Sequence, residues 1–199
     1  MLNRTILGTG TALAVAALVL AGCGGDTDSG RDMSAMTGNA APSVSHDEAD
    51  VAFAQGMVPH HRQALDMAEL ASTRASNAQV KDLASRIEKA QDPEIQKMNG
   101  WLSQWNAAMP GMSGMPGMPV STMPGMMGDA DLAKLRQATG AEFDKMFLQM
   151  MIGHHQGAVE MARTELAGGT NSDAKALAQS IVETQTAEIN EMRQLLTSM

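Results

Sequence analysis

The chain has 199 residues, of which 44% are apolar and only 3% aromatic, with no tyrosine and 19 methionines. This composition disfavours sheets, which need β-branched and aromatic residues, and favours helices packed through Ala, Leu, Ile and Met. The net charge of -8 argues against nucleic-acid binding and is compatible with cation binding. The single cysteine, Cys23, excludes an internal disulfide and a thiolate metal cluster.

Residues 1–22 predict a lipoprotein signal peptide, because Arg4 precedes an apolar run that ends in small residues. The tetrapeptide Leu-Ala-Gly-Cys at 20–23 resembles a bacterial lipobox. It implies that Cys23 is lipidated and that the protein is extracytoplasmic, anchored to the bacterial cell membrane. An uncleaved anchor is the alternative, although spanning a bilayer takes about 20 strongly apolar residues. Residues 23–45 predict a flexible tether, rich in Gly, Asp and Ser.

Residues 46–199 predict an all-α domain with four long helices. Apolar residues recur every three or four positions over about 47–75, 78–107, 140–167 and 172 to near the C-terminus. Asn77 is the expected N-cap of the second long helix, and Asn171 or Ser172 that of the fourth. A short helix is expected over 129–138, with Asp129 as its N-cap.

The linker at 109–128 predicts no regular structure, because it holds four prolines and five glycines. It also holds seven methionines: Met109, Met112, Met115, Met118, Met123, Met126 and Met127. They either pack as apolar side chains on the helices or bind Cu(I), since soft thioethers select the soft ion. The repeated M-x-x-M spacing favours copper binding.

A duplicated helical hairpin underlies the domain. Residues 48–102 align with 142–196 without a gap, and twenty of the fifty-five positions are identical. A single hairpin cannot bury its apolar stripe, so two of them are expected to pack as a four-helix bundle. The linker is then the crossover between the halves, and pseudo-twofold symmetry predicts two related sites.

The candidate metal ligands come from a motif present once in each repeat. Residues 57–67 read M-V-P-H-H-R-Q-A-L-D-M and residues 151–161 read M-I-G-H-H-Q-G-A-V-E-M. Imidazole with thioether suits copper, zinc prefers other partners, and di-iron sites need Glu-x-x-His, which is absent at these histidines. The candidates are Met57, His60, His61, Met67, Met151, His154, His155 and Met161. On helical spacing, Met67 and Met161 are equally well explained as core residues.

Polar residues on the second and fourth helices should stand level with the histidines. Folding each hairpin about its turn brings Met57 opposite about Glu94 and Met151 opposite about Glu188. The expected partners or additional ligands are Gln91, Glu94, Gln185 and Glu188.

The repeated pattern F-x-Q-x-M-[VI]-x-H-H-x-x-A-x-[DE]-M-A resembles the ferritin-like family called domain of unknown function 305, which includes CopM-like extracytoplasmic copper-binding proteins. The resemblance extends from about residue 46 to 198. It implies a ferritin-like helical bundle and, for CopM-like members, copper binding through Met and His in copper tolerance. Carried onto this chain, it points to the same eight candidate ligands.

The expected function is that of a copper-binding lipoprotein that sequesters copper, as Cu(I), Cu(II) or both, or hands it to a partner protein. Under this hypothesis the protein is not an enzyme. Two alternatives stay open: a ferritin-like metalloenzyme such as an oxidase, and a structural or partner-binding bundle without metal.

Overall fold

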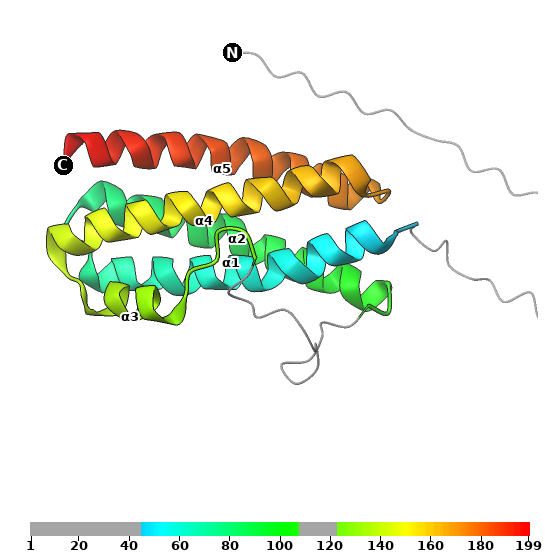
Figure 1. Ribbon diagram of the computed structural model, residues 1–199, viewed down its shortest axis with the longest axis horizontal. Helices are drawn as coiled ribbons and strands as arrows, with labels where there is room; N and C mark the ends of the chain where they lie inside the picture. The colour runs from blue at the N-terminus through cyan, green and yellow to red at the C-terminus, as the bar shows by residue number, and fades with distance from the viewer. Residues whose placement is uncertain (1–44, 108–122) are drawn as a thin grey trace, which may run out of the picture. The chain divides into compact units, whose positions relative to one another are not determined.

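A computed structural model describes residues 45–107 and 123–199, and these residues form five helices and no strand. The helices are α1 (Glu48–Arg74), α2 (Ala78–Gln104), α3 (Asp129–Gln137), α4 (Gly140–Gly168) and α5 (Ser172–Ser198) (Figure 1). The predicted all-α class with four long helices is confirmed. None of the helices in the described part of the chain could cross a membrane. The expected signal peptide, Cys23, the tether up to residue 44 and Met109 to Met118 lie outside the described residues.

The two hairpins meet through their first helices. α1 and α2 form one hairpin, α4 and α5 the other, and α1 packs along α4 far more extensively than α2 packs on α5. α1 and α4 run antiparallel and α3 lies at one end of the bundle (Figure 1). The motif residues of both repeats belong to α1 and α4, so this packing brings the two motifs to the centre of the domain.

The helix starts follow the sequence with one exception. Asp47 caps α1 in a capping box with Asp50, and Asn77 and Asn171 accept hydrogen bonds at the starts of α2 and α5. The prediction that Asp129 caps α3 was wrong. Gly128 is the N-cap, without a side-chain bond, and Asp129 is the first helical residue, where its charge favours the positive end of the helix dipole.

Two buried aspartates tie the halves together at opposite ends. Asp50 of α1 accepts hydrogen bonds from the backbone N–H groups of Thr170 and Asn171, at the start of α5. Asp144 of α4 accepts them from Ser76 and Asn77, at the start of α2. Each hairpin therefore supplies a carboxylate to unpaired backbone donors of the other.

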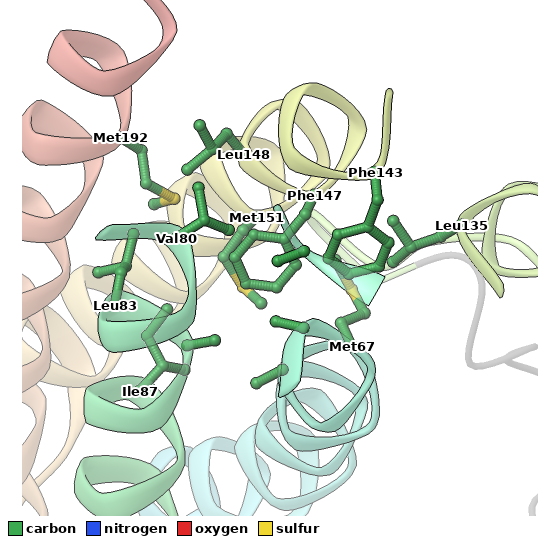
Figure 2. Packing of buried hydrophobic residues seen from close by; sticks show 14 of the residues in the cluster. Met67, Val80, Leu83, Ile87, Leu135, Phe143, Phe147, Leu148, Met151 and Met192 are labelled. Atoms are coloured by element: carbon green, nitrogen blue, oxygen red, sulfur yellow. The ribbon is translucent and has the colours of Figure 1, made fainter. Parts of the chain in front are cut away.

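The apolar core is divided into two clusters. One contains Met67, Leu83, Phe143, Phe147 and Met151, which pack closely together with α3 through Leu135 (Figure 2). The other contains Phe53, Met57, Met98, Trp101 and Ile181. Buried polar residues lie between the two clusters on every long helix. On α1 and α4 they are the paired histidines of the repeated motif, and on α2 and α5 they are the expected polar partners.

Glu165 breaks the repeat symmetry at one end of the bundle, since its counterpart in the first repeat is Ala71. A Cβ atom on Gly169 would lie 2.2 Å from Glu165 Oε1 and 2.7 Å from Asp50 Oδ1, so both carboxyl groups lie against this glycine. Burial and the contact with Asp50 raise the pKa of Glu165 to about 8, and that of Asp50 is lowered by hydrogen bonds it accepts. Glu165 is thus protonated at neutral pH, which lets its carboxyl group lie beside the Asp50 carboxylate without charge repulsion.

Replacing Glu165 by glutamine removes this titration while keeping a donor for Asp50. The folded-state pKa lies above the unfolded one, so stability from the protonated group is complete below about pH 4.5 and is lost as the pH rises through about 8. Glu165→Gln should therefore be more stable than the wild type at pH 9, with the difference shrinking toward pH 5. Urea unfolding across this range measures it. A difference independent of pH would contradict the raised pKa of Glu165.

Candidate metal centre

A buried polar layer crosses the bundle between the two apolar clusters. Its members come from all four long helices: His60, His61, Gln91, Glu94, His154, His155, Gln185 and Glu188. All four histidines are buried, and both glutamates are largely buried. The structure therefore brings the two histidine motifs into one layer, where the sequence predicted two related sites.

His60 and His154 meet where α1 crosses α4. Their ring centroids are 3.8 Å apart and the ring planes are inclined by 39°. These are equivalent positions of the two repeats, so the contact lies on the pseudo-twofold axis. Burial lowers the pKa of His60 to about 3, and it lowers the pKa of His154 well below its usual value. Both imidazoles are neutral at physiological pH, which is the form that binds metal.

His61 and His155 each face a glutamate of their own hairpin. His61 Nε2 lies 2.7 Å from Glu94 Oε2, and His155 Nε2 lies 2.8 Å from Glu188 Oε2. A carboxylate only accepts, so Nε2 carries the proton in both rings and Nδ1 keeps its lone pair when the ring is neutral. A carboxylate that orients a histidine in this way is the usual outer partner of a metal-binding imidazole.

Buried nitrogen atoms without hydrogen bonds mark the candidate ligand atoms. Among the described residues, Nδ1 of His60, His61 and His155 and both ring nitrogens of His154 are buried and have no partner. Unpartnered buried polar atoms are costly and rare in folded proteins. One nitrogen of neutral His154 carries a proton, so the four rings offer four free lone pairs in one layer. This arrangement fits a group that takes up electron pairs, as a metal ion does.

The candidate methionines are unequally placed. Met57 and Met151 are fully buried, three and four residues before the histidines on their helices, and flank the polar layer from opposite clusters. Met67 is also fully buried, and Figure 2 shows it among Phe143 and Leu135, as expected of a core residue. Met161 is only partly buried.

Residues 123–128, which we call the strap, cover His60 from outside the bundle. The Pro124 carbonyl oxygen accepts a hydrogen bond from His60 Nε2 at 3.1 Å, so the free lone pair of this ring is also at Nδ1. Met127 is held by two hydrogen bonds between its backbone and the Gln63 amide, at 2.7 and 3.0 Å. The strap therefore makes the surroundings of His60 and His154 unequal.

Two glycines let the strap approach α4. A Cβ atom on Gly157 would lie 2.0 Å from the Pro124 carbonyl oxygen. Gly125 has a positive φ of 77°, and a Cβ atom there would lie 2.7 Å from the backbone oxygen of Gly153 and 2.8 Å from that of His154. Sequence reasoning missed the roles of Pro124, Gln63 and these glycines. The available signal was Gly157 itself, because a glycine inside a long helix lowers stability unless something packs closely against it.

Other expected partners are present without a complete ligand shell. Gln91 and Gln185 are buried, and neither side-chain oxygen has a partner in the described residues. No group of three or more His, Cys, Asp or Glu side chains within residues 45–107 and 123–199 is arranged to hold a metal ion by itself. Thioethers would have to complete the ligand set. Metal binding stays a prediction for all eight candidate residues. The fifth histidine, His46, lies outside the layer and stacks on Trp105 with ring centroids 4.8 Å apart.

Solved structures resemble this chain over most of its length. A DUF305 protein from Streptomyces coelicolor is 34% identical, with a TM-score of 0.69, covering 75% of this chain and 93% of its own. A DUF305 fragment from Deinococcus radiodurans is 33% identical, with a TM-score of 0.69, covering 77% and 98%. CopM in its Cu(II)-bound form is 35% identical, with a TM-score of 0.65, covering 75% and 96%, and CopM has also been solved bound to Cu(I).

A comparison with curated proteins gives no match. The sequence matches the family described as Domain of unknown function (DUF305) over residues 50–196, which is most of the chain. This match spans both hairpins and both histidine motifs. The duplicated bundle with its central polar layer therefore belongs to the DUF305 family.

Proposed function

We propose that the protein binds copper in the polar layer and sequesters it or passes it to a partner protein, without catalysing a reaction. The observation that carries this proposal is the set of unpartnered Nδ1 atoms on oriented imidazoles, flanked by buried thioethers. Imidazole suits both copper oxidation states, and thioether favours Cu(I). The similarity to CopM, solved with Cu(I) and with Cu(II), supports the choice of metal.

We also propose that the domain works outside the cytoplasm, held to the membrane by lipidated Cys23. The support is the signal-peptide pattern of residues 1–22 and the lipobox-like tetrapeptide. The Streptomyces coelicolor relative carries the name of a secreted protein. Outside the cytoplasm, a copper-binding domain can take up the ion before it enters the cell.

Replacing both central histidines tests the copper site. The double variant His60→Phe and His154→Phe keeps two flat rings in the layer and removes their nitrogen donors. Its affinity for Cu(I), measured against a competing chelator, should fall by more than the roughly 100-fold that loss of an outer partner costs. The Cu(II) electron paramagnetic resonance spectrum should also lose nitrogen hyperfine coupling.

His46→Ala is the matched control, since this histidine lies outside the polar layer and should leave both copper measurements unchanged. Far-ultraviolet circular dichroism checks that the double variant remains helical. Unchanged copper affinity in a folded double variant would overturn the proposed function. Oxygen consumption in the presence of Cu(I) would favour a metalloenzyme instead.

The glutamates provide a second test of the same site. Glu94→Gln and Glu188→Gln keep a hydrogen-bonding group beside His61 and His155 but remove the charge that orients and polarises each imidazole. Each variant should bind Cu(II) about 10-fold to 100-fold more weakly. Equal affinities for wild type and variants in a calorimetric titration would exclude His61 and His155 as ligands. Glu191→Gln, which removes a surface ion pair with Arg86, is the control.

A further inference from the structure

The four imidazoles of the polar layer are closed to solvent, so an ion can reach them only if part of the protein moves. Each of the four side chains is at most 1% exposed. The helices that carry the layer are 27 to 29 residues long and packed along their length. The strap over His60 is short and holds no helical residue. Short segments without regular structure open more easily than packed helices, so the strap is the candidate cover of the layer.

Within the described residues, three hydrogen bonds join the strap to α1. His60 Nε2 donates one of them, to the Pro124 carbonyl oxygen at 3.1 Å. The Gln63 amide makes the other two: its oxygen accepts from the Met127 N–H at 2.7 Å, and its nitrogen donates to the Met127 carbonyl at 3.0 Å. Gln63 is only partly buried and belongs to neither apolar cluster. Its contact with the strap is therefore not a product of core packing.

The strap lies over equivalent positions of the two repeats. Gln63 of the first repeat corresponds to Gly157 of the second. Gln63 holds the strap through its amide, whereas the missing side chain of Gly157 makes room for the Pro124 carbonyl. The strap thus bridges α1 and α4 at the level where His60 meets His154. Two positions that duplication made identical have diverged to hold and to receive the same segment.

We propose that the strap is a gate over the polar layer and that Gln63 is the positioning residue that keeps it closed. Copper enters and leaves the layer when the Gln63 amide releases Met127 and the strap lifts from the two helices. The gate rests on the proposed copper function and determines how fast the ion is exchanged. A gate that is closed in both the empty and the loaded protein changes the rates of entry and release by the same factor, so it leaves the equilibrium affinity unchanged.

Copper transfer from the loaded full chain to an excess of a colorimetric Cu(I) chelator measures the gate. Gln63→Leu removes both hydrogen bonds to Met127 and keeps a side chain of similar size. Because two neutral hydrogen bonds are lost, transfer should be at least about tenfold faster, while the Cu(I) affinity should change by less than about threefold. Gln156→Leu, the same substitution at an exposed position of α4, is the matched control and should alter neither value.

Gly157→Ala displaces the strap from the other helix. The added methyl group would lie 2.0 Å from the Pro124 carbonyl oxygen, and alanine is favourable inside a helix, so the strap should shift while α4 stays folded. Copper transfer should again be faster than in the wild type. Gln63→Leu should add little to the rate in the Gly157→Ala background, because both substitutions act through the same segment. Fully additive effects on the rate would contradict a single gate.

Hydrogen exchange of the Met127 amide follows the strap in the metal-free protein. This N–H donates to Gln63, so it should exchange at least about tenfold faster in Gln63→Leu, with the amides of α5 unchanged. Unchanged exchange would overturn the gate, and so would faster exchange with an unchanged rate of copper transfer. A wild-type chain whose Met127 amide is protected but which binds no copper would refute the proposed function, and with it the role of the strap in copper exchange.

Discussion

The structure depends on burying four imidazoles in the middle of an apolar helical bundle. Desolvation holds His60 and His154 neutral, and several ring nitrogens have no hydrogen-bond partner in the described residues. An unbroken apolar core would avoid this cost. The polar layer instead separates two apolar clusters, each of which must stabilise its own end of the bundle. The unfavourable layer is consistent with selection for binding rather than for stability alone.

Duplication alone would give a symmetric molecule, but this one departs from symmetry at specific points. The strap covers the His60 side of the ring pair, Glu165 replaces an alanine beside Asp50, and Gly56 replaces a methionine. Each departure puts different chemistry at equivalent positions. One ring has an acceptor, one end has a protonated acid, and two partly buried methionines lie beside Gly56. The two repeats therefore make a single composite centre with distinguishable sides.

The sequence predicts the helices well because each is encoded locally. Asn77 and Asn171 cap helices as expected, and the stripe through Phe53, Met57 and Ala64 is buried. The register of the hairpin also predicts, to within about one turn, that Glu94 lies at the same height along the bundle as the histidines. The meeting of His60 and His154 could not be predicted in this way, because it depends on how α1 crosses α4. The position of the strap could not be predicted either. It depends on close backbone approaches at Gly125 and Gly157, which leave no periodic pattern in the sequence.

The exchanged aspartates have a consequence for how the domain is assembled. Asp50 satisfies backbone donors of the second hairpin and Asp144 those of the first, so neither hairpin completes its own hydrogen bonding. A lone hairpin would have both an exposed apolar stripe and unsatisfied helix ends. Pairing with a second copy would restore both the apolar contacts and the carboxylate partners of these helix ends. In the fused chain this exchange between the two repeats is intramolecular, so it does not depend on protein concentration.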